Sequence, residues 1–480
     1  MRSLQLTPGA ALCGWLATGS LWGALACGCA AEKPVPSPQI APAAFEHGPH
    51  GQASSWPAQD WYRGFGSHEL DDLVDFAAHN NTDLAGASER VVEADARARQ
   101  AGAAILPSVS GNANANYLAG RSDQGSGHEL DWLAMLSASY EVDFWGKNRA
   151  GARAARLEAA ASRADRDTVA LTILGAVADE YFQVLALRER ADIARANRDA
   201  AQKILDAVQA RFTAGAASPT DVASQKAALH SAQIAIADLQ RAETQARAAL
   251  AVLLGRIPES FEIAGNSLDA LREPVVSAGL PSELLTRRPD VVAAEANLRA
   301  GSANVSVARA AMFPTLALTA GAGVQNPALP AIVLTIPGVG PSLQLGANLT
   351  QPIFDHGRLS AQRDEAAARE RELLTTYRSA IIAALVDVEN ALGALQYLDA
   401  KREFEQGSLA ESERAFEGAR LRYQSGSGDF LTVLQAQRTL YAARDQFTQY
   451  KLARLQALVA LCKALGGGWS SSAPTSNAAL

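Results

Sequence analysis

Residues that could carry out chemistry are scattered along this sequence. The seven histidines show no metal-ligand spacing, since His230 and His356 are isolated and His47 and His50 lie in a polar stretch near the amino terminus. Asp71 and Asp72 open a helical pattern, where acidic side chains favour the helix dipole. Glycines from 321 to 323 lie in a strand pattern and lack the spacing of a phosphate-binding loop. We therefore predict no catalytic residues, no metal site and no cofactor.

Cysteine chemistry is concentrated at the amino terminus. Arg2 precedes an apolar stretch over residues 10–26, and Leu25-Ala26-Cys27-Gly28-Cys29-Ala30 resembles a lipobox, whose cysteine becomes lipid-modified after cleavage. We predict a lipoprotein signal peptide over residues 1–28 and lipidation of Cys29, with Cys27 as the alternative. An ordinary signal peptide with incidental cysteines is the competing interpretation. The proline-rich stretch that follows predicts an extended, lipid-anchored tether over residues 29–66.

The elements that could position functional residues occur twice. Gly146, Gly215 and Gly255 recur at a shift of 211 residues as Gly357, Gly426 and Gly466. This predicts repeats over 67–255 and 282–466, joined by a linker over 256–281 and followed by a disordered tail over 467–480. Cys462 has no partner in the mature chain, so it is predicted to be a buried thiol.

Each repeat predicts a helix, a β-hairpin, a very long helix and a returning helix. The first helices span Glu69–Ile105 and Pro289–Met312, the long helices 146–213 and 357–424, and the returning helices 219–255 and 429–466. At 1.5 Å per residue, each long helix would extend roughly 100 Å. Tyr377, Ile381, Ala384, Val388 and Ala391 follow a heptad spacing typical of coiled-coil packing. The helices alone would also fit an ordinary coiled coil.

The hairpins, over 107–144 and 314–354, alternate between apolar and polar residues. Strands of this kind fit a transmembrane β-barrel or a soluble sheet with one wet face. The residues predicted to face lipid are Tyr117, Trp132, Leu136, Ala138, Tyr140, Leu318, Leu345 and Leu349. Four strands cannot close a barrel, and an eight-stranded barrel is filled by its own side chains. A water-filled duct therefore requires three or more chains, and the pattern does not separate three from four.

Charge and composition exclude other classes of function. The net charge of −7 gives no basic footprint for nucleic acid. Aromatic residues make up only 6% of the chain, which favours slender helices over one large core.

The combined motifs resemble those of TolC/NodT-type outer-membrane factors, in particular the lipoproteins of resistance-nodulation-division efflux systems. The resemblance covers almost the whole mature chain and includes Trp61–Phe65, Arg288–Val291, Gln351–Phe354 and both helical turns. It implies a homotrimer in which a twelve-stranded barrel spans the outer membrane and a twelve-helix tunnel lies in the periplasm. It implies a passive exit duct, not an enzyme, with a periplasmic adaptor, an inner-membrane pump and outer-membrane lipid as partners.

The resemblance also assigns roles to the helical turns. Gly215, Ser218, Asp221, Gly426 and Asp429 would dock the adaptor at the periplasmic tip. Leu431, Thr432 and Gln435 would form the gate, although family members often carry acids where Thr432 and Gln435 stand, and Asp429 could supply that negative ring. A type I secretion duct and a periplasmic coiled-coil adaptor remain alternatives. The cargo stays open among drugs, solvents, aromatic acids and metal ions.

Overall fold

The computed structural model describes residues 42, 44–47, 56–122, 125–276, 279, 281–326, 340–467 and 469. The signal peptide, Cys27 and Cys29, and most of the tether and tail predicted from the sequence lie outside the described residues. Those described belong to one compact unit, Ile40–Leu480.

Corresponding helices of the two repeats have equal lengths, as the duplication predicts. The first pair has 22 residues each, the long pair 67 and the returning pair 35. They are α2 (Thr82–Ala103) and α6 (Pro289–Ala310), α3 (Lys147–Thr213) and α7 (Arg358–Gln424), and α4 (Pro219–Leu253) and α8 (Phe430–Ala464). The predicted fold class, mainly helical with a two-fold repeat, is confirmed.

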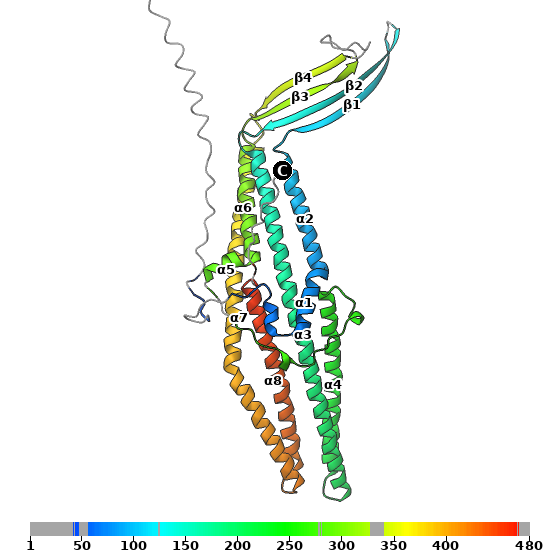
Figure 1. Ribbon diagram of the computed structural model, residues 1–480, viewed down its shortest axis with the longest axis vertical. Coiled ribbons are helices and arrows are strands. Elements are labelled where there is room, and N and C mark those ends of the chain that lie inside the picture. Colours follow the sequence, from blue (N-terminus) through cyan, green and yellow to red (C-terminus); the bar gives the residue numbers. More distant parts are fainter. Residues whose placement is uncertain are drawn as a thin grey trace, which may run out of the picture. The chain divides into compact units, whose positions relative to one another are not determined.

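Helix α3 packs on the shorter helices α2, α4, α6 and α8, whereas α7 packs on α6 and α8. Near the sheet the packing order is α2, α3, α6 and α7, and farther from it the order is α4, α3, α8 and α7 (Figure 1). The described helices therefore form one layer, with α2 and α4 at one edge and α7 at the other.

Two glycines fix the places where a returning helix meets the start of a shorter one. Gly255, after α4, has φ +65°, and a Cβ there would lie 2.4 Å from the carbonyl oxygen of Asn80. Gly466, after α8, has φ +86°, and a Cβ there would lie 2.1 Å from the carbonyl oxygen of Arg287. Because only glycine permits both the φ angle and the approach, α4 ends against the start of α2, and α8 against the start of α6.

The four strands form one antiparallel sheet in the order β1-β2-β3-β4. They are β1 (Ser108–Ser122), β2 (Gly125–Val142), β3 (Thr315–Asn326) and β4 (Gly340–Thr350). The two hairpins join through β2 and β3, where Ala138 pairs with Ala320. Since paired residues share a face, this register aligns most apolar residues of the four strands on one side of the sheet, while Leu133 and Met135 lie on the other side, opposite Asn114 and Asn112.

The main core lies where the shorter helices and the linker pack on α3. Its aromatic centre includes Phe65 and Phe182, whose ring centroids are 4.9 Å apart. The predicted extended tether is wrong for Trp61–Phe65, which form a 3-10 helix (η1) in this core. Burial of Trp61, Tyr62 and Phe65 stabilises this turn against the extended chain.

The first helix of repeat 1 is interrupted, so the single helix predicted over Glu69–Ile105 is wrong. Helix α1 spans His68–Asn80, and Asn81 then adopts an extended conformation and caps α2 by accepting a hydrogen bond from the Leu84 amide. In repeat 2 the short helix α5 (Pro281–Arg287) occupies the equivalent place before α6. Two further 3-10 turns, η2 (Pro258–Ser260) and η3 (Leu268–Ala270), lie in the linker.

Helices α3 and α7 each contain an apolar stretch long enough, by length and composition only, to cross a membrane, with mean hydropathies of 1.4 and 1.3. This criterion is also met by core helices of soluble proteins. In α3, Ile173, Val177 and Phe182 are buried in the main core, so much of its apolar character serves packing.

Candidate functional site

The sheet presents a broad apolar face. All eight residues predicted to face lipid lie on this face, because the strand register places them on the same side. Leu345 is 78% exposed and Leu136 is 63% exposed, although both are large apolar side chains. A surface of this kind is stable only against lipid, detergent or another protein.

The opposite face of the sheet is polar and mostly uncharged. Asn112, Asn114 and Asn116 project from β1, and Gln344 and Asn348 from β4. At the end of β2, Glu141 Oε1 lies 2.5 Å from Lys147 Nζ. The face could line a water-filled space.

Exposed apolar side chains also surround the sheet–helix junction. Trp145 stacks on Phe313 at 4.7 Å, and its Nε1 donates a hydrogen bond to the carbonyl oxygen of Pro314 at 2.8 Å. Ile353 and Phe354 are 90% and 80% exposed. Our sequence interpretation used Phe313, Ile353 and Phe354 only as parts of family motifs and gave them no place at a membrane interface, although aromatic residues at strand ends are typical of such interfaces.

The turns at the far ends of the helical hairpins have closely similar backbones. Gly215 and Gly426 have φ angles of +76° and +78°. The amide of Gly215 donates to the carbonyl of Phe212, and that of Ala216 to the carbonyl of Arg211. Gly426 and Ser427 repeat these two bonds with Tyr423 and Arg422, so each turn ends its helix with a Schellman motif.

Side chains cap the helices that return from these turns. Ser218 and Asp221 form a reciprocal capping box at the start of α4. At the start of α8, Asp429 accepts hydrogen bonds from the amide of Thr432 and from its hydroxyl, both at 2.8 Å. The amide of Thr432, followed by its hydroxyl, lowers the pKa of Asp429, so this exposed carboxylate stays charged well into acid.

The predicted gate residues Leu431, Thr432 and Gln435 are all exposed on the first turns of α8. An interaction that our sequence interpretation missed joins the two turns. Arg211 Nη1 donates to the carbonyl oxygen of Tyr423 at 3.1 Å, and its guanidinium lies 4.6 Å from the centroid of the Tyr423 ring. The repeat offers a signal for it, since the Arg211–Phe212 and Arg422–Tyr423 pairs occupy equivalent positions.

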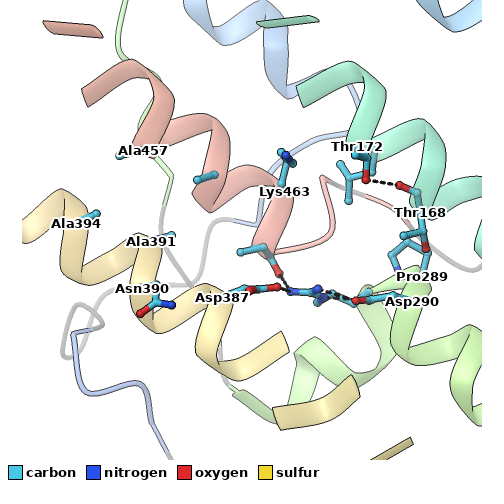
Figure 2. A pocket seen from close by; sticks show the side chains of 14 residues that line it. Thr168, Thr172, Pro289, Asp290, Asp387, Asn390, Ala391, Ala394, Ala457 and Lys463 are labelled. Carbon is cyan, nitrogen blue, oxygen red and sulfur yellow. Dashed lines mark hydrogen bonds and ion pairs between the residues drawn. The ribbon is translucent and has the colours of Figure 1, made fainter. Parts of the chain in front are cut away.

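A cavity of about 490 Å³ lies where α6 and α8 meet between α3 and α7 (Figure 2). Within its wall, Arg288 Nη2 lies 2.6 Å from Asp290 and Nη1 lies 3.0 Å from Asp387. Lys463 and Thr172 also line it. Nearby, burial raises the pKa of Asp179 to about 6, although the charge of Lys463 opposes that rise.

The described residues include no cluster of three or more histidine, cysteine or acidic side chains that could hold a metal ion. Cys462 is fully buried in the core, and burial raises its pKa to about 12, so its thiol is protonated and unreactive.

Comparisons with known proteins agree with this geometry. The sequence profile of the family described as "Outer membrane efflux protein" matches residues 73–256 and 280–467. "Pyoverdine export outer membrane protein OpmQ" of Pseudomonas aeruginosa is 43% identical over 456 residues, covering 93% of this chain and 95% of its own. "Toluene efflux pump outer membrane protein TtgF" of Pseudomonas putida is 30% identical, covering 89% of this chain and 90% of its own.

Solved structures of channels have the same fold. The outer-membrane channel OprN matches with a TM-score of 0.82 and 25% identity, covering 91% of this chain and 98% of its own.

Proposed function

We propose, from the premise that this chain belongs to the outer membrane efflux protein family, that three copies close into one water-filled exit duct. The chain is an outer-membrane efflux channel, and its family is not enzymatic. The observation that supports a closed ring is that the sheet and the helical layer each end in two unlike edges, which have no partner within the described residues; the number three comes from the family resemblance.

The edges lie on corresponding sides. β1 leads from α2, and both α2 and α4 lie at one side of the helical layer. β4 leads into α7, which lies at the other side. An edge of one kind can therefore join the other kind on the next copy, a head-to-tail contact that forms a ring where the rotation closes.

The internal repeat indicates which residues would meet. Within one chain α8 packs on α3, and Lys463 lies against Gly175. A shift of 211 residues converts this contact into Val252 of α4 against Val386 of α7. These two valines are 71% and 49% exposed, so we propose that they meet between neighbouring chains.

The free side of α7 has a second apolar stripe that supports this contact. Ile382, Val386, Tyr397 and Phe404 are exposed at spacings of 4, 11 and 7 residues, the separations of a coiled-coil seam. The stripe is distinct from the buried seam of Tyr377, Ile381 and Val388, which packs within the chain.

Three chains would supply twelve strands. An eight-stranded barrel is filled by side chains and much larger barrels hold channels, so twelve strands with a polar inner face would enclose water. The apolar face would contact outer-membrane lipid, and acyl chains on Cys29, or Cys27, would add a second membrane anchor.

We further propose that the helical turns form the periplasmic tip, where an adaptor links the duct to an inner-membrane pump. Gly215, Ser218, Asp221, Gly426 and Asp429 would form the docking surface, with Leu431, Thr432 and Gln435 as the gate. A Cβ at Gly426 would meet no atom within 4 Å, so the strain of a β-branched residue at this positive φ would act on the turn itself. We expect Gly426→Val to lower export of the cargo at normal trimer levels; unchanged export at normal trimer levels would contradict this role.

For the cargo we propose a siderophore of the pyoverdine type. The support is that the two pyoverdine export proteins share 43% and 40% identity with this chain, whereas the toluene and cation efflux proteins share 30% and 29%. Deletion of the gene should retain the siderophore in the periplasm, as measured by mass spectrometry of periplasmic extract and medium. Normal secretion by the deletion strain would exclude this cargo.

The duct itself is tested by native mass spectrometry of the protein purified in detergent, combined with electrical recording in planar bilayers. We expect a mass of three chains and stepwise conductance. A monomer that needs no detergent for solubility would overturn the proposal.

A further inference from the structure

We infer that the cavity between α3, α6, α7 and α8 is a docking point for an organic anion, with the Lys463 ammonium as its recognition group. This inference rests on the proposed duct, because it places the cavity on the wall of the bore. It adds a cargo-contacting site at mid-height of the helical layer, away from both the sheet and the tip.

Contacts of α7 show on which face of the helical layer the cavity opens. Glu389 accepts hydrogen bonds from the amides of Glu46 and His47, so the amino-terminal segment lies on its side of α7. Asp387 lines the cavity and precedes Glu389 by two residues, which turns it by about 200° around the helix. The cavity therefore opens on the face of the helical layer opposite to the amino-terminal segment. In the proposed duct, that segment would obstruct the bore if it lay inside. The bore is therefore on the same side of the layer as the cavity.

Two cations border the cavity, and only one is available. Arg288 is held by Asp290 and Asp387, and it also donates to the carbonyl oxygen of Ala464 at 3.3 Å. The Lys463 ammonium makes no hydrogen bond or ion pair with any residue in the described part of the chain, although its backbone carbonyl accepts from the amide of Gly466. Figure 2 shows its side chain beside Thr172, at the cavity wall.

Asp179 is the acid that competes for Lys463. Its charge interacts with the ammonium, yet its Oδ1 is buried and has no hydrogen-bond partner among the described residues. The ammonium is therefore near a carboxylate without being bonded to it, which leaves its three N–H groups for a ligand.

The neighbouring backbone makes room for this lysine. A Cβ at Gly175 would lie 2.3 Å from Cδ of Lys463, so the glycine in the middle of α3 forms the groove in which the lysine stem lies. Val252 is the residue of repeat 1 that is equivalent to Lys463. The contact between the helix ends therefore does not require a cation at this position. Glycine in a helix interior lowers helix stability by about 1 kcal/mol relative to alanine, and no other contact within α3 offsets this loss.

The rest of the lining indicates the class of ligand. Ala391, Ala394, Ala457 and Ala460 form an apolar wall, while Thr172 and Asn390 add polar groups. The volume of about 490 Å³ suits an organic molecule better than a single inorganic ion. An apolar body carrying a carboxylate fits this combination.

The test uses benzoate as the anionic probe and benzyl alcohol as its neutral counterpart, titrated by calorimetry into the full-length protein in detergent. We expect one benzoate site per chain and no measurable binding of benzyl alcohol. Lys463→Gln should weaken benzoate binding by about tenfold or more, because a charge-assisted hydrogen bond is lost. Gly175→Ala should do the same by displacing the lysine, although alanine is the better helix former.

The matched control is Lys203→Gln, which removes an exposed cation elsewhere on α3 and should leave binding unchanged. Equal binding by wild type and Lys463→Gln, or no binding by wild type, overturns the inference. Inorganic phosphate is run alongside, and phosphate binding that matches benzoate would overturn the assignment to organic anions. Trimer mass and efflux are measured on the same variants, so failure of the site is distinguishable from failure of the duct.

Discussion

Asp179 lies on α3 near the end of α8, and one of its carboxylate oxygens is buried with no hydrogen-bond partner in the part of the chain that the structure describes. Burial of an ionised carboxylate is unfavourable unless it is paired, and the nearby Lys463 compensates only in part. No sequence pattern predicts this relation, because the two residues are almost 300 positions apart in the chain. Cys462 illustrates the opposite case, since a lone cysteine within an apolar helix was correctly predicted to be buried.

The first prediction concerns the pH dependence of stability. The folded-state pKa of Asp179, about 6, exceeds the ordinary value of 3.8, so the folded state binds this proton more tightly than the unfolded state. Its contribution to stability is therefore lost as pH rises through that window, and the full penalty is present above pH 6. Asp179→Asn should stabilise the protein at pH 7.5 by about 1–3 kcal/mol and have little effect below pH 4.

Thermal denaturation in detergent at the two pH values measures this difference. A variant with a lower melting temperature at pH 7.5 would contradict the burial argument.

Helices and strands were the most predictable elements. The proline-free stretches that end at glycine predicted both 67-residue helices. The alternation of apolar and polar residues predicted which side chains share a face of the sheet. The break at Asn81 was missed because apolar periodicity continues across it, although Asn80-Asn81-Thr82-Asp83 contains an N-cap signal. The turn Trp61–Phe65 was missed because five residues carry no periodicity and its stability comes from partners distant in the sequence.

The second prediction separates two kinds of glycine at helix ends. Gly215 needs a positive φ but has open space around its Cβ position, so Gly215→Ala should cost about 1–2 kcal/mol. Gly466 combines a positive φ with a carbonyl oxygen at 2.1 Å, so Gly466→Ala should cost more than about 3 kcal/mol by adding a steric clash.

Melting temperature and the yield of folded protein compare these two variants. Equal losses would show that α8 does not abut the start of α6 as described.

At the scale of the whole molecule, the sheet and the helical layer of one chain end in two unlike edges. The number of copies that would join these edges into a ring does not follow from the sequence. Closure depends on strand tilt and stagger, which side-chain patterns do not encode. The repeat nevertheless predicts contacts across the boundary, because α4 against the next α7 would imitate α8 against α3 within the chain.

The third prediction tests that contact. Val386→Glu should reduce the trimer fraction, since it places a charge in an apolar seam, and adding Val252→Lys should restore it by supplying the opposite charge. Val386→Ile is the conservative control. Size-exclusion chromatography with native mass spectrometry measures the trimer fraction, and a normal trimer for Val386→Glu would place the interface elsewhere.

The fourth prediction tests the membrane-facing side of the sheet. Ala138→Arg places a charge on the apolar face and should cost up to about 2–4 kcal/mol, the value for arginine at the bilayer midplane. Ser137→Arg, one residue away on the polar face, should be tolerated. Heat resistance of the trimer in detergent measures both, and equal behaviour of the two variants would argue against a lipid-exposed face.

The equal lengths of corresponding helices restrict how such a protein can evolve. Both hairpin turns would have to reach the same depth for an adaptor to seat evenly, so lengthening α3 by two turns would leave the tip lopsided unless α7 grew by the same amount. The returning helices would need matching insertions as well. A protein of this kind that spans a wider periplasm would therefore need four coordinated insertions, each in whole heptads. A single insertion or deletion could not adjust the protein to a different spacing between the two membranes.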